Sequence, residues 1–175
     1  MSRHSSTSAA LPIAHVVLRI LIVVNWLGGA AIATLLIAMP TSQWIRTALG
    51  IPPWDEARAL IVGMHAIAVF GLAAIPLNYV VLRRLLAIVE TVRAGDPFVA
   101  ANAQRLHAIG WALLALQVLS LVIGAIARAA STPAHPIRVS AGFSINGWLA
   151  VLFTFLLARV FAEGTLMRDD LEGTV

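Results

Sequence analysis

Histidines and carboxylates are the side chains of this sequence that could carry out acid–base chemistry or hold a metal ion. There are five histidines and eight acidic residues in 175. Adjacent carboxylates occur at residues 55–56 and 169–170, but neither pair has a histidine close by in the sequence to complete an acid–base set. Cysteine is absent, which excludes thiol nucleophiles and thiolate metal sites. The sequence also contains no glycine-rich phosphate loop, HExxH pair or GxSxG turn. We therefore expect no enzymatic activity, no catalytic residue, no metal site and no cofactor.

The positions of three histidines leave one cofactor alternative open. Membrane cytochromes hold haem between facing histidines inside a four-helix bundle. His15 and His107 lie near one edge of the predicted membrane helices, on two helices that should run parallel, so they could pair at one depth. His65 lies inside a predicted helix and has no partner at its depth. Haem binding is therefore an alternative to the main interpretation below.

Four long apolar stretches must position these side chains, at residues 18–39, 59–82, 106–127 and 143–162. Each provides the roughly 20 apolar residues that a helix needs to cross a hydrocarbon core of about 30 Å. Such stretches must be helical, because lipid offers no partner for backbone N–H and C=O groups. Charged residues make up 11% of the chain, against about 25% in soluble domains. The sequence predicts an all-α integral membrane four-helix bundle.

The basic residues, all twelve of them arginine, predict the orientation. Eight lie in the terminal segments and the central connection, and four lie in the other two loops. The positive-inside rule then places both termini and the central connection in the cytoplasm of a bacterial inner-membrane protein. No helix-turn-helix pattern or basic-aromatic surface is present, so direct nucleic-acid binding is not expected. We expect a disordered terminus over 1–15, a membrane domain over 16–164 and an acidic tail over 165–175.

The connections between the spans carry local structural signals. Apolar residues recur every three or four positions over 83–94, which predicts a short amphipathic helix extending span two along the cytoplasmic interface. Gly95 should end this helix. Asp96 should then cap the next helix, with Pro97 at its first position. A second interfacial helix is expected at 42–49, and Pro76 should kink span two.

Polar side chains inside the spans have two interpretations. Hydrogen bonding between helices is the simpler one, and a ligand contact in a small-solute channel or transporter is the alternative. No acidic residue lies within a span. The pair Gly29 and Ala33 permits close packing, either inside one bundle or in a homo-oligomer. The intramembrane polar residues are Asn25, His65, Asn78, Gln117 and Asn146.

Two segments carry a family resemblance. One contains Ala94-Gly95-Asp96-Pro97-Phe98, Asn102, Arg105-Leu106 and Ile109-Gly110-Trp111; the other runs from Val160 to Val175. Together they resemble a bacterial four-span membrane family known as domain of unknown function 2975. Within these segments, Leu166 stands where a polar or basic residue would be expected. The resemblance implies an inner-membrane protein, often encoded beside a small Xre-type helix-turn-helix regulator, and hence a regulatory or interaction role.

The predicted interaction surface consists of the central connection and the tail. Apart from the lipid bilayer, the expected partner is a small cytoplasmic helix-turn-helix regulator. The proposed roles are charge pairing between connection and tail and presentation of Phe98, although the tail could instead be a solvated end. The residues of this surface are Arg83, Arg84, Arg93, Asp96, Phe98, Asn102, Arg105, Glu163, Arg168, Asp169 and Asp170.

Overall fold

The structure, a computed structural model, describes residues 7–42, 44, 47, 54–133 and 136–172. It contains α1 (Thr7–Thr41), α3 (Trp54–Arg93), α4 (Ala100–Ala130) and α5 (Ile145–Glu172), and these described residues include no β-strand. Each helix includes a segment long and apolar enough to cross a membrane: Ala10–Ala38, Arg58–Arg93, Ala100–Ala130 and Ile145–Arg168. The predicted all-α, four-span fold is confirmed. The chain is a multi-pass membrane protein.

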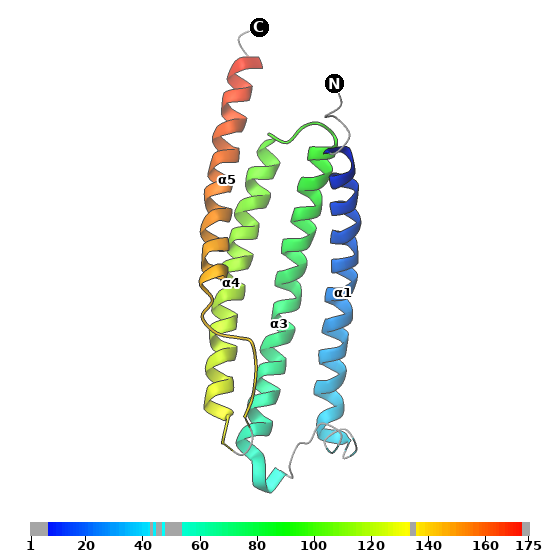
Figure 1. Ribbon diagram of the computed structural model, residues 1–175, viewed down its shortest axis with the longest axis vertical. Helices are drawn as coiled ribbons and strands as arrows, with labels where there is room; N and C mark the ends of the chain where they lie inside the picture. The colour runs from blue at the N-terminus through cyan, green and yellow to red at the C-terminus, as the bar shows by residue number, and fades with distance from the viewer. Residues whose placement is uncertain (1–6, 43, 45–46, 48–53, 134–135, 173–175) are drawn as a thin grey trace.

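The four helices lie side by side in the order of the sequence (Figure 1). Among the described residues, only consecutive helices approach each other closely: α1 with α3, α3 with α4, and α4 with α5. Both the start of α1 and the end of α5 lie at one end of the molecule, which we call the N/C end. The bundle is therefore an open row, in which each outer helix has a single neighbour.

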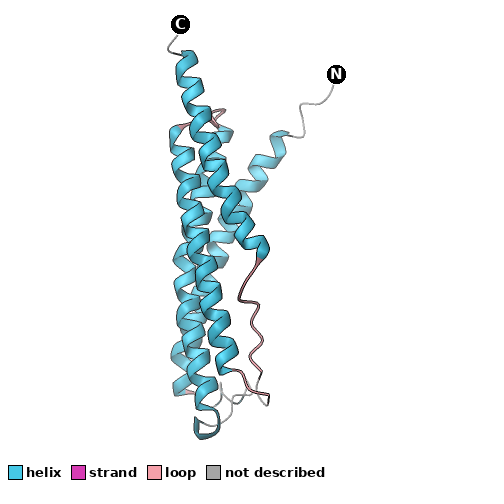
Figure 2. Cartoon of the chain, turned by 90° about the vertical axis from the view of Figure 1, so that its left-hand side faces the viewer, coloured by secondary structure: helices cyan, strands magenta, loops and turns pink. Residues whose placement is uncertain are grey.

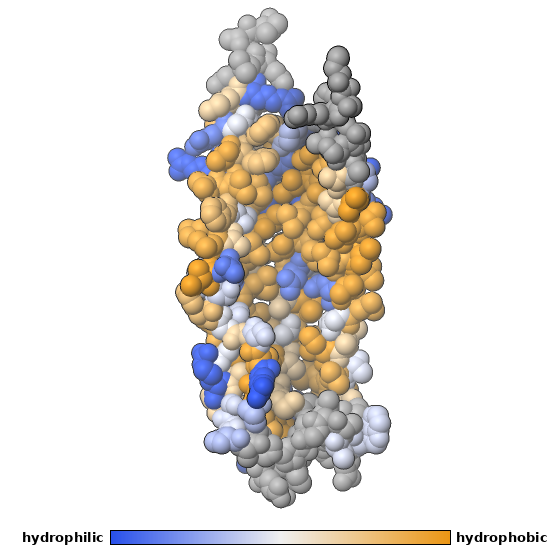
Figure 3. Space-filling view, viewed as in Figure 1, coloured by the Kyte–Doolittle hydropathy of each residue, from blue (hydrophilic) through white to orange (hydrophobic). Residues whose placement is uncertain are grey.

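Most of the apolar side chains of this row face outwards. Many along α1 and α5, such as Leu27 and Leu152, are more than half exposed. Hydrophobic residues cover the middle of the molecule, and hydrophilic residues gather mainly towards its two ends (Figure 3). In water such a surface would be strongly unfavourable. In a bilayer it is the surface that lipid chains cover.

Glycine allows close approach at each of the three helix interfaces. A Cβ at Gly29 would lie 3.1 Å from the Ile75 side chain on α3, and one at Gly63 would collide with Ala130 on α4. A Cβ at Gly110 would lie 2.9 Å from the ring of Phe155 on α5. Small residues are the usual device for packing helices in lipid, where no hydrophobic force drives them together. The Gly29 face thus packs inside the chain.

Two expectations for the helix ends are corrected or left open. Residues 7–15 were expected to be disordered, but α1 begins at Thr7 because its apolar pattern extends well before the predicted span. The interfacial helix expected over 42–49 falls mainly outside the described residues. The amphipathic segment after span two is helical as predicted, and it continues α3 without interruption to Arg93.

The turn after α3 is also partly corrected. Gly95 ends the helix as predicted, with φ +87°. The N–H of Gly95 donates to the Val92 carbonyl and the N–H of Asp96 to the Thr91 carbonyl, the pattern of a Schellman motif. Asp96 does not cap α4, which starts at Ala100 after an N-cap residue with no side-chain hydrogen bond. The expected cap at Asp96 and first position at Pro97 were wrong, because the Asp96 carboxylate binds an arginine instead.

A non-helical segment precedes the fourth span. The helix α5 begins about halfway along the molecule, and the chain reaches it as an extended segment that runs back from the opposite end (Figure 2). Gly142 donates its N–H to Ser120 Oγ at 3.0 Å and accepts a hydrogen bond from the same hydroxyl at 3.2 Å. Ser120 lies eight residues before Arg128 in α4, or about 12 Å along the helix axis. The extended segment therefore re-enters the apolar stretch of α4, where a loop outside the membrane was expected.

Gly124 makes this re-entrant segment possible, and replacing it tests the arrangement. A Cβ at this position would lie 2.7 Å from the Ala141 carbonyl oxygen and 2.9 Å from Gly142 Cα. We expect Gly124→Ala to lower the free energy of unfolding by about 1–3 kcal/mol through overpacking, as measured by thermal unfolding in detergent. Gly28→Ala is the control, because a Cβ there meets nothing within 4 Å. Equal stability of the two variants would contradict the packing described.

Candidate interaction site at the N/C end

A buried asparagine holds the connection between α3 and α4. Asn102 is fully buried, and its Nδ2 donates to Thr91 Oγ1 and to the Pro97 carbonyl, each at 2.8 Å. Its Oδ1 accepts a hydrogen bond from Arg105 Nη1 at 2.7 Å. The same Nη1 also donates to the Ala87 carbonyl at 3.3 Å. The bonds to Thr91, Pro97 and Ala87 join α4 to α3 or to the turn, and the Arg105–Asn102 bond lies within α4, so the network fixes the corner between the two helices.

An ion pair joins this corner to the far end of the chain. Arg168 Nη1 donates to Asp96 Oδ1, linking residues 72 positions apart. Both side chains are a little under half exposed. Pairing between connection and tail was predicted, and it occurs here with the aspartate on the connection and the arginine on α5. The side chains of Asp169 and Asp170 lie outside the described residues.

Aromatic packing reinforces the same junction. The rings of Phe98 and Phe161 are 5.3 Å apart between centroids, and a Cβ at Gly164 would lie 3.0 Å from the Phe98 ring. Phe98 remains 43% exposed. Leu166 and Met167 follow on α5 and are 64% and 65% exposed. The junction therefore presents apolar side chains beside charged ones.

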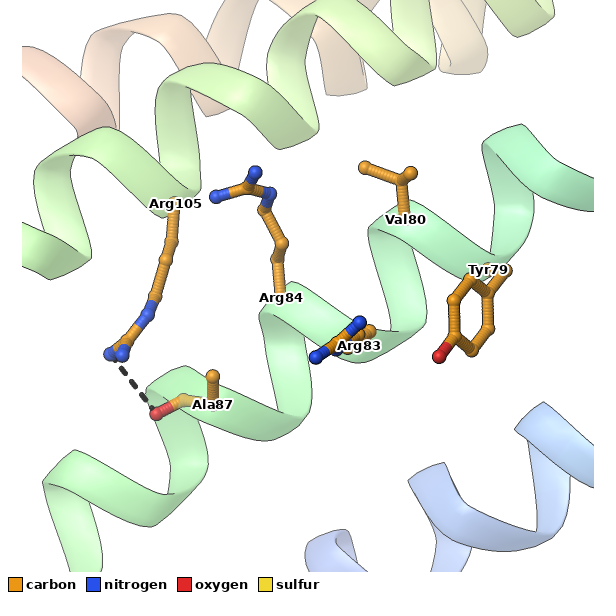
Figure 4. Close-up of a pocket in the computed structure, with 6 residues that line it drawn as sticks. All are labelled: Tyr79, Val80, Arg83, Arg84, Ala87 and Arg105. Atoms are coloured by element: carbon orange, nitrogen blue, oxygen red, sulfur yellow. Dashed lines mark hydrogen bonds between the residues drawn. The ribbon is translucent and has the colours of Figure 1, made fainter.

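The arginines of the predicted surface occupy different environments. Arg159 Nε donates to Glu163 Oε1 at 3.1 Å, an i,i+4 pair within α5. The Glu163 carboxylate therefore pairs within α5, and this bond does not join α5 to the α3–α4 connection. Arg93 is exposed at the end of α3. A cavity of about 420 Å³ between α3 and α4 (Figure 4) is lined by the other three arginines, Arg83, Arg84 and Arg105. Tyr79, Val80 and Ala87 complete its lining.

Most of the intramembrane polar side chains take structural positions. Asn25 Nδ2 donates to the Ile75 carbonyl of α3 at 3.1 Å, which confirms the expected bond between helices. The Nδ1 of His65 lies 2.8 Å from the Ile61 carbonyl of its own helix. The Gln117 side chain lies against Gly147 at the start of α5. Asn78 is half-buried on α3, and Asn146 is exposed on α5.

The structure separates the two histidines that the haem alternative would pair. His15 Nδ1 of α1 lies 3.9 Å from Glu90 Oε1 of α3. His107 of α4 packs edge-on against Trp111 and Phe155. Since α1 and α4 do not adjoin in the row, the structure does not bring His15 and His107 together, as the haem alternative would require. Within the described ranges, no group of three or more metal-ligating side chains comes together.

Sequence reasoning missed three residues that organise the fold. Thr91 Oγ1 accepts a hydrogen bond from Asn102 Nδ2, and the same hydroxyl donates to the Ile88 carbonyl at 2.8 Å. Ser120 and Gly124 hold the re-entrant segment. Their spacing of four on an apolar helix was a usable signal, because it is the small-xxx-small pattern that allows a backbone to approach closely.

Four apolar helices with a polar junction at one end define a multi-pass, all-α membrane protein. The chain belongs to the family described as protein of unknown function, DUF2975, whose model matches residues 51–175. The matched region contains α3, α4 and α5 and both segments that form the junction. No curated protein and no solved structure matches the chain.

The Asn102 network yields a stability prediction. Asn102→Ala removes the two hydrogen bonds that Nδ2 donates and the one that Oδ1 accepts from Arg105, and it leaves the Pro97 carbonyl without the partner it has here. We expect the free energy of unfolding to fall by about 1–3 kcal/mol, the usual cost of such a loss. Gln104→Ala is the matched control, an exposed amide on the same helix, for which a change within about 0.5 kcal/mol is expected. Thermal unfolding of both variants in the same detergent measures this difference. Similar losses of unfolding free energy in the two variants would contradict a structural role for the network.

Proposed function

We propose that this chain is a bacterial inner-membrane protein whose N/C end lies in the cytoplasm and binds a soluble regulatory protein. The observation that carries the proposal is the Asp96–Arg168 ion pair. It joins the α3–α4 connection to the end of α5 and so makes one surface from two segments that are distant in the sequence. The proposal assigns no catalytic chemistry to the chain.

The character of this surface supports protein binding. Phe98, Leu166 and Met167 expose apolar area near the charged pair. Exposed apolar side chains with a polar rim are typical of protein–protein contacts. The fixed corner around Asn102 also favours binding, because a surface that is already ordered loses little conformational entropy when a partner docks.

A small Xre-type helix-turn-helix regulator is the partner we propose. The family resemblance suggests such a neighbour, and a regulator of this kind would meet the N/C end from the cytoplasm. The arginine distribution supports that orientation, since eight of twelve lie in the termini and the central connection. Binding would hold the regulator at the membrane and change the transcription of its target genes.

Transport is the less favoured function. Non-helical backbone that interrupts the helical packing beside a membrane span is a trait of many transporters, whose broken helices line substrate sites. Here the polar groups at the interruption bind each other, because the Ser120 hydroxyl satisfies both backbone groups of Gly142. The three described carboxylates, on Glu90, Asp96 and Glu163, each face a basic side chain near the N/C end. These contacts favour a structural role for the interruption.

The orientation can be tested directly, because the chain has no cysteine. Ala94 and Thr132 are exposed near opposite ends of the molecule. We expect Thr132→Cys to react with a membrane-impermeant maleimide in intact cells. Ala94→Cys should react only after the inner membrane is permeabilised. The reverse pattern would place the N/C end outside the cytoplasm and reject the proposal.

The regulatory role can be tested by exchanging charges. Deleting the chain should change a defined set of transcripts, and the wild-type gene should restore them. We expect neither Asp96→Arg nor Arg168→Asp alone to restore these transcripts, because each variant places two like charges together. The double exchange should restore them. The exposed pair contributes at most about 1 kcal/mol, so all three variants should still fold.

Arg159→Asp is the matched control for the charge exchange, because Arg159 pairs within α5 and not across the junction. It should retain regulation. Transcripts that are unchanged by deletion of the chain would reject the regulatory role outright. Regulation that survives both single reversals would show that the junction is not the surface involved.

A further inference from the structure

Three arginines converge on one cavity near the N/C end. Tyr79, Val80, Arg83, Arg84 and Ala87 line it from α3, and Arg105 lines it from α4, around about 420 Å³. Arg105 reaches from α4 to the backbone of α3 at Ala87, while Arg84 extends from α3 towards α4 (Figure 4). The cavity is thus bounded on both sides by guanidinium groups.

No described carboxylate neutralises this charge. The acidic side chains that the structure describes pair elsewhere: Glu90 with His15, Asp96 with Arg168 and Glu163 with Arg159. Like charges gathered at the edge of a low-dielectric region repel one another more strongly than they would in water. Such an arrangement favours binding of an anion.

Arginine is suited to one class of anion in particular. Its planar fork of donors matches the oxygens of a phosphate, with which it forms paired hydrogen bonds. Arg105 is already oriented, since Nη1 donates to Asn102 Oδ1 at 2.7 Å and to the Ala87 carbonyl at 3.3 Å. Both bonds use the same nitrogen, which leaves the Nε and Nη2 donors of that guanidinium for a ligand.

The position of the cavity relates it to the membrane surface. Arg83 and Arg84 directly follow the apolar stretch 59–82, and Arg105 directly precedes the stretch 106–127. Tyr79, in the last turn of the stretch 59–82, packs on Trp26 of α1 with 5.6 Å between ring centroids. Basic pockets between membrane helices at this level are suited to lipid phosphates.

We propose that this cavity binds a phosphate group, supplied by the headgroup of an anionic phospholipid in the leaflet that the N/C end faces. The three guanidinium groups hold the phosphate oxygens, and Tyr79 and Val80 form the apolar wall beside them. A soluble phosphate offers the same chemistry, so the experiment must distinguish the two sources. The inference needs no protein partner and stands apart from the proposed regulatory function.

Native mass spectrometry of the full chain released from detergent provides the test. The protein is titrated with phosphatidylglycerol, with zwitterionic phosphatidylcholine and, separately, with inorganic phosphate. We expect the wild type to bind one phosphatidylglycerol preferentially. The double variant Arg83→Gln/Arg84→Gln should bind it about 25-fold more weakly, from about fivefold for each arginine. Arg93→Gln is the matched control, an exposed arginine on the same helix outside the cavity, and it should stay within about twofold of the wild type.

The outcomes assign the source or reject the site. If millimolar inorganic phosphate does not displace bound phosphatidylglycerol, the lipid headgroup is the source of the phosphate. Binding of inorganic phosphate alone, lost in the double variant, identifies a soluble phosphate. A wild type that shows no preference for phosphatidylglycerol over phosphatidylcholine and no binding of inorganic phosphate overturns the proposal. So does equal weakening by Arg93→Gln and by the double variant.

A conservative variant separates charge from geometry. Arg83→Lys/Arg84→Lys keeps both positive charges but loses the planar fork of donors. We expect its affinity to lie between those of the wild type and the glutamine variant. Helical circular dichroism and thermal unfolding of each variant confirm that it is folded. Full wild-type affinity in the lysine variant would contradict recognition through paired hydrogen bonds.

Discussion

Lipid provides no hydrogen-bond partner and no hydrophobic drive for helices to associate. The contacts between the membrane-spanning helices of this structure are explained by that constraint. The helices of the row meet where glycine removes the side chain, at Gly29, Gly63 and Gly110. Non-helical backbone can lie against the apolar stretch of α4 because the Ser120 hydroxyl hydrogen-bonds both the N–H and the carbonyl of Gly142. Close packing and a few internal hydrogen bonds therefore replace the buried core of a soluble protein.

The N/C end follows different physics, because water and headgroups can reach it. There a buried amide network around Asn102 fixes the turn, and a half-exposed ion pair fastens the end of α5 to it. Such a pair contributes little free energy. Its importance is geometric, since it sets the position of α5 relative to the connection and so determines which apolar side chains share a surface.

The apolar stretches made the four spans predictable, because about 20 mostly apolar residues in a row match the length that a helix needs to cross a bilayer. The polar edges were harder. Asp96 carries every local signal of a helix cap, yet its carboxylate binds Arg168, and a contact over 72 positions leaves no trace in local sequence. The re-entrant segment escaped notice because the apolar alternation around Ile137 and Val139 is too short to predict an element, and the stretch was expected to be a loop outside the membrane. Among the residues predicted for interaction, a hydrogen bond joins Asn102 and Arg105. The role of Asn102 also depends on Thr91, which sequence reasoning passed over.

The open row of helices has a consequence for biosynthesis. Because each helix contacts only its predecessor and its successor, every interface can close as soon as the next segment leaves the ribosome and enters the bilayer. No helix must wait for a distant one, and the long loop closures that slow folding are avoided. Assembly can thus proceed in the order of synthesis. The Asp96–Arg168 contact forms after the helix interfaces that precede it, because Arg168 lies near the end of α5.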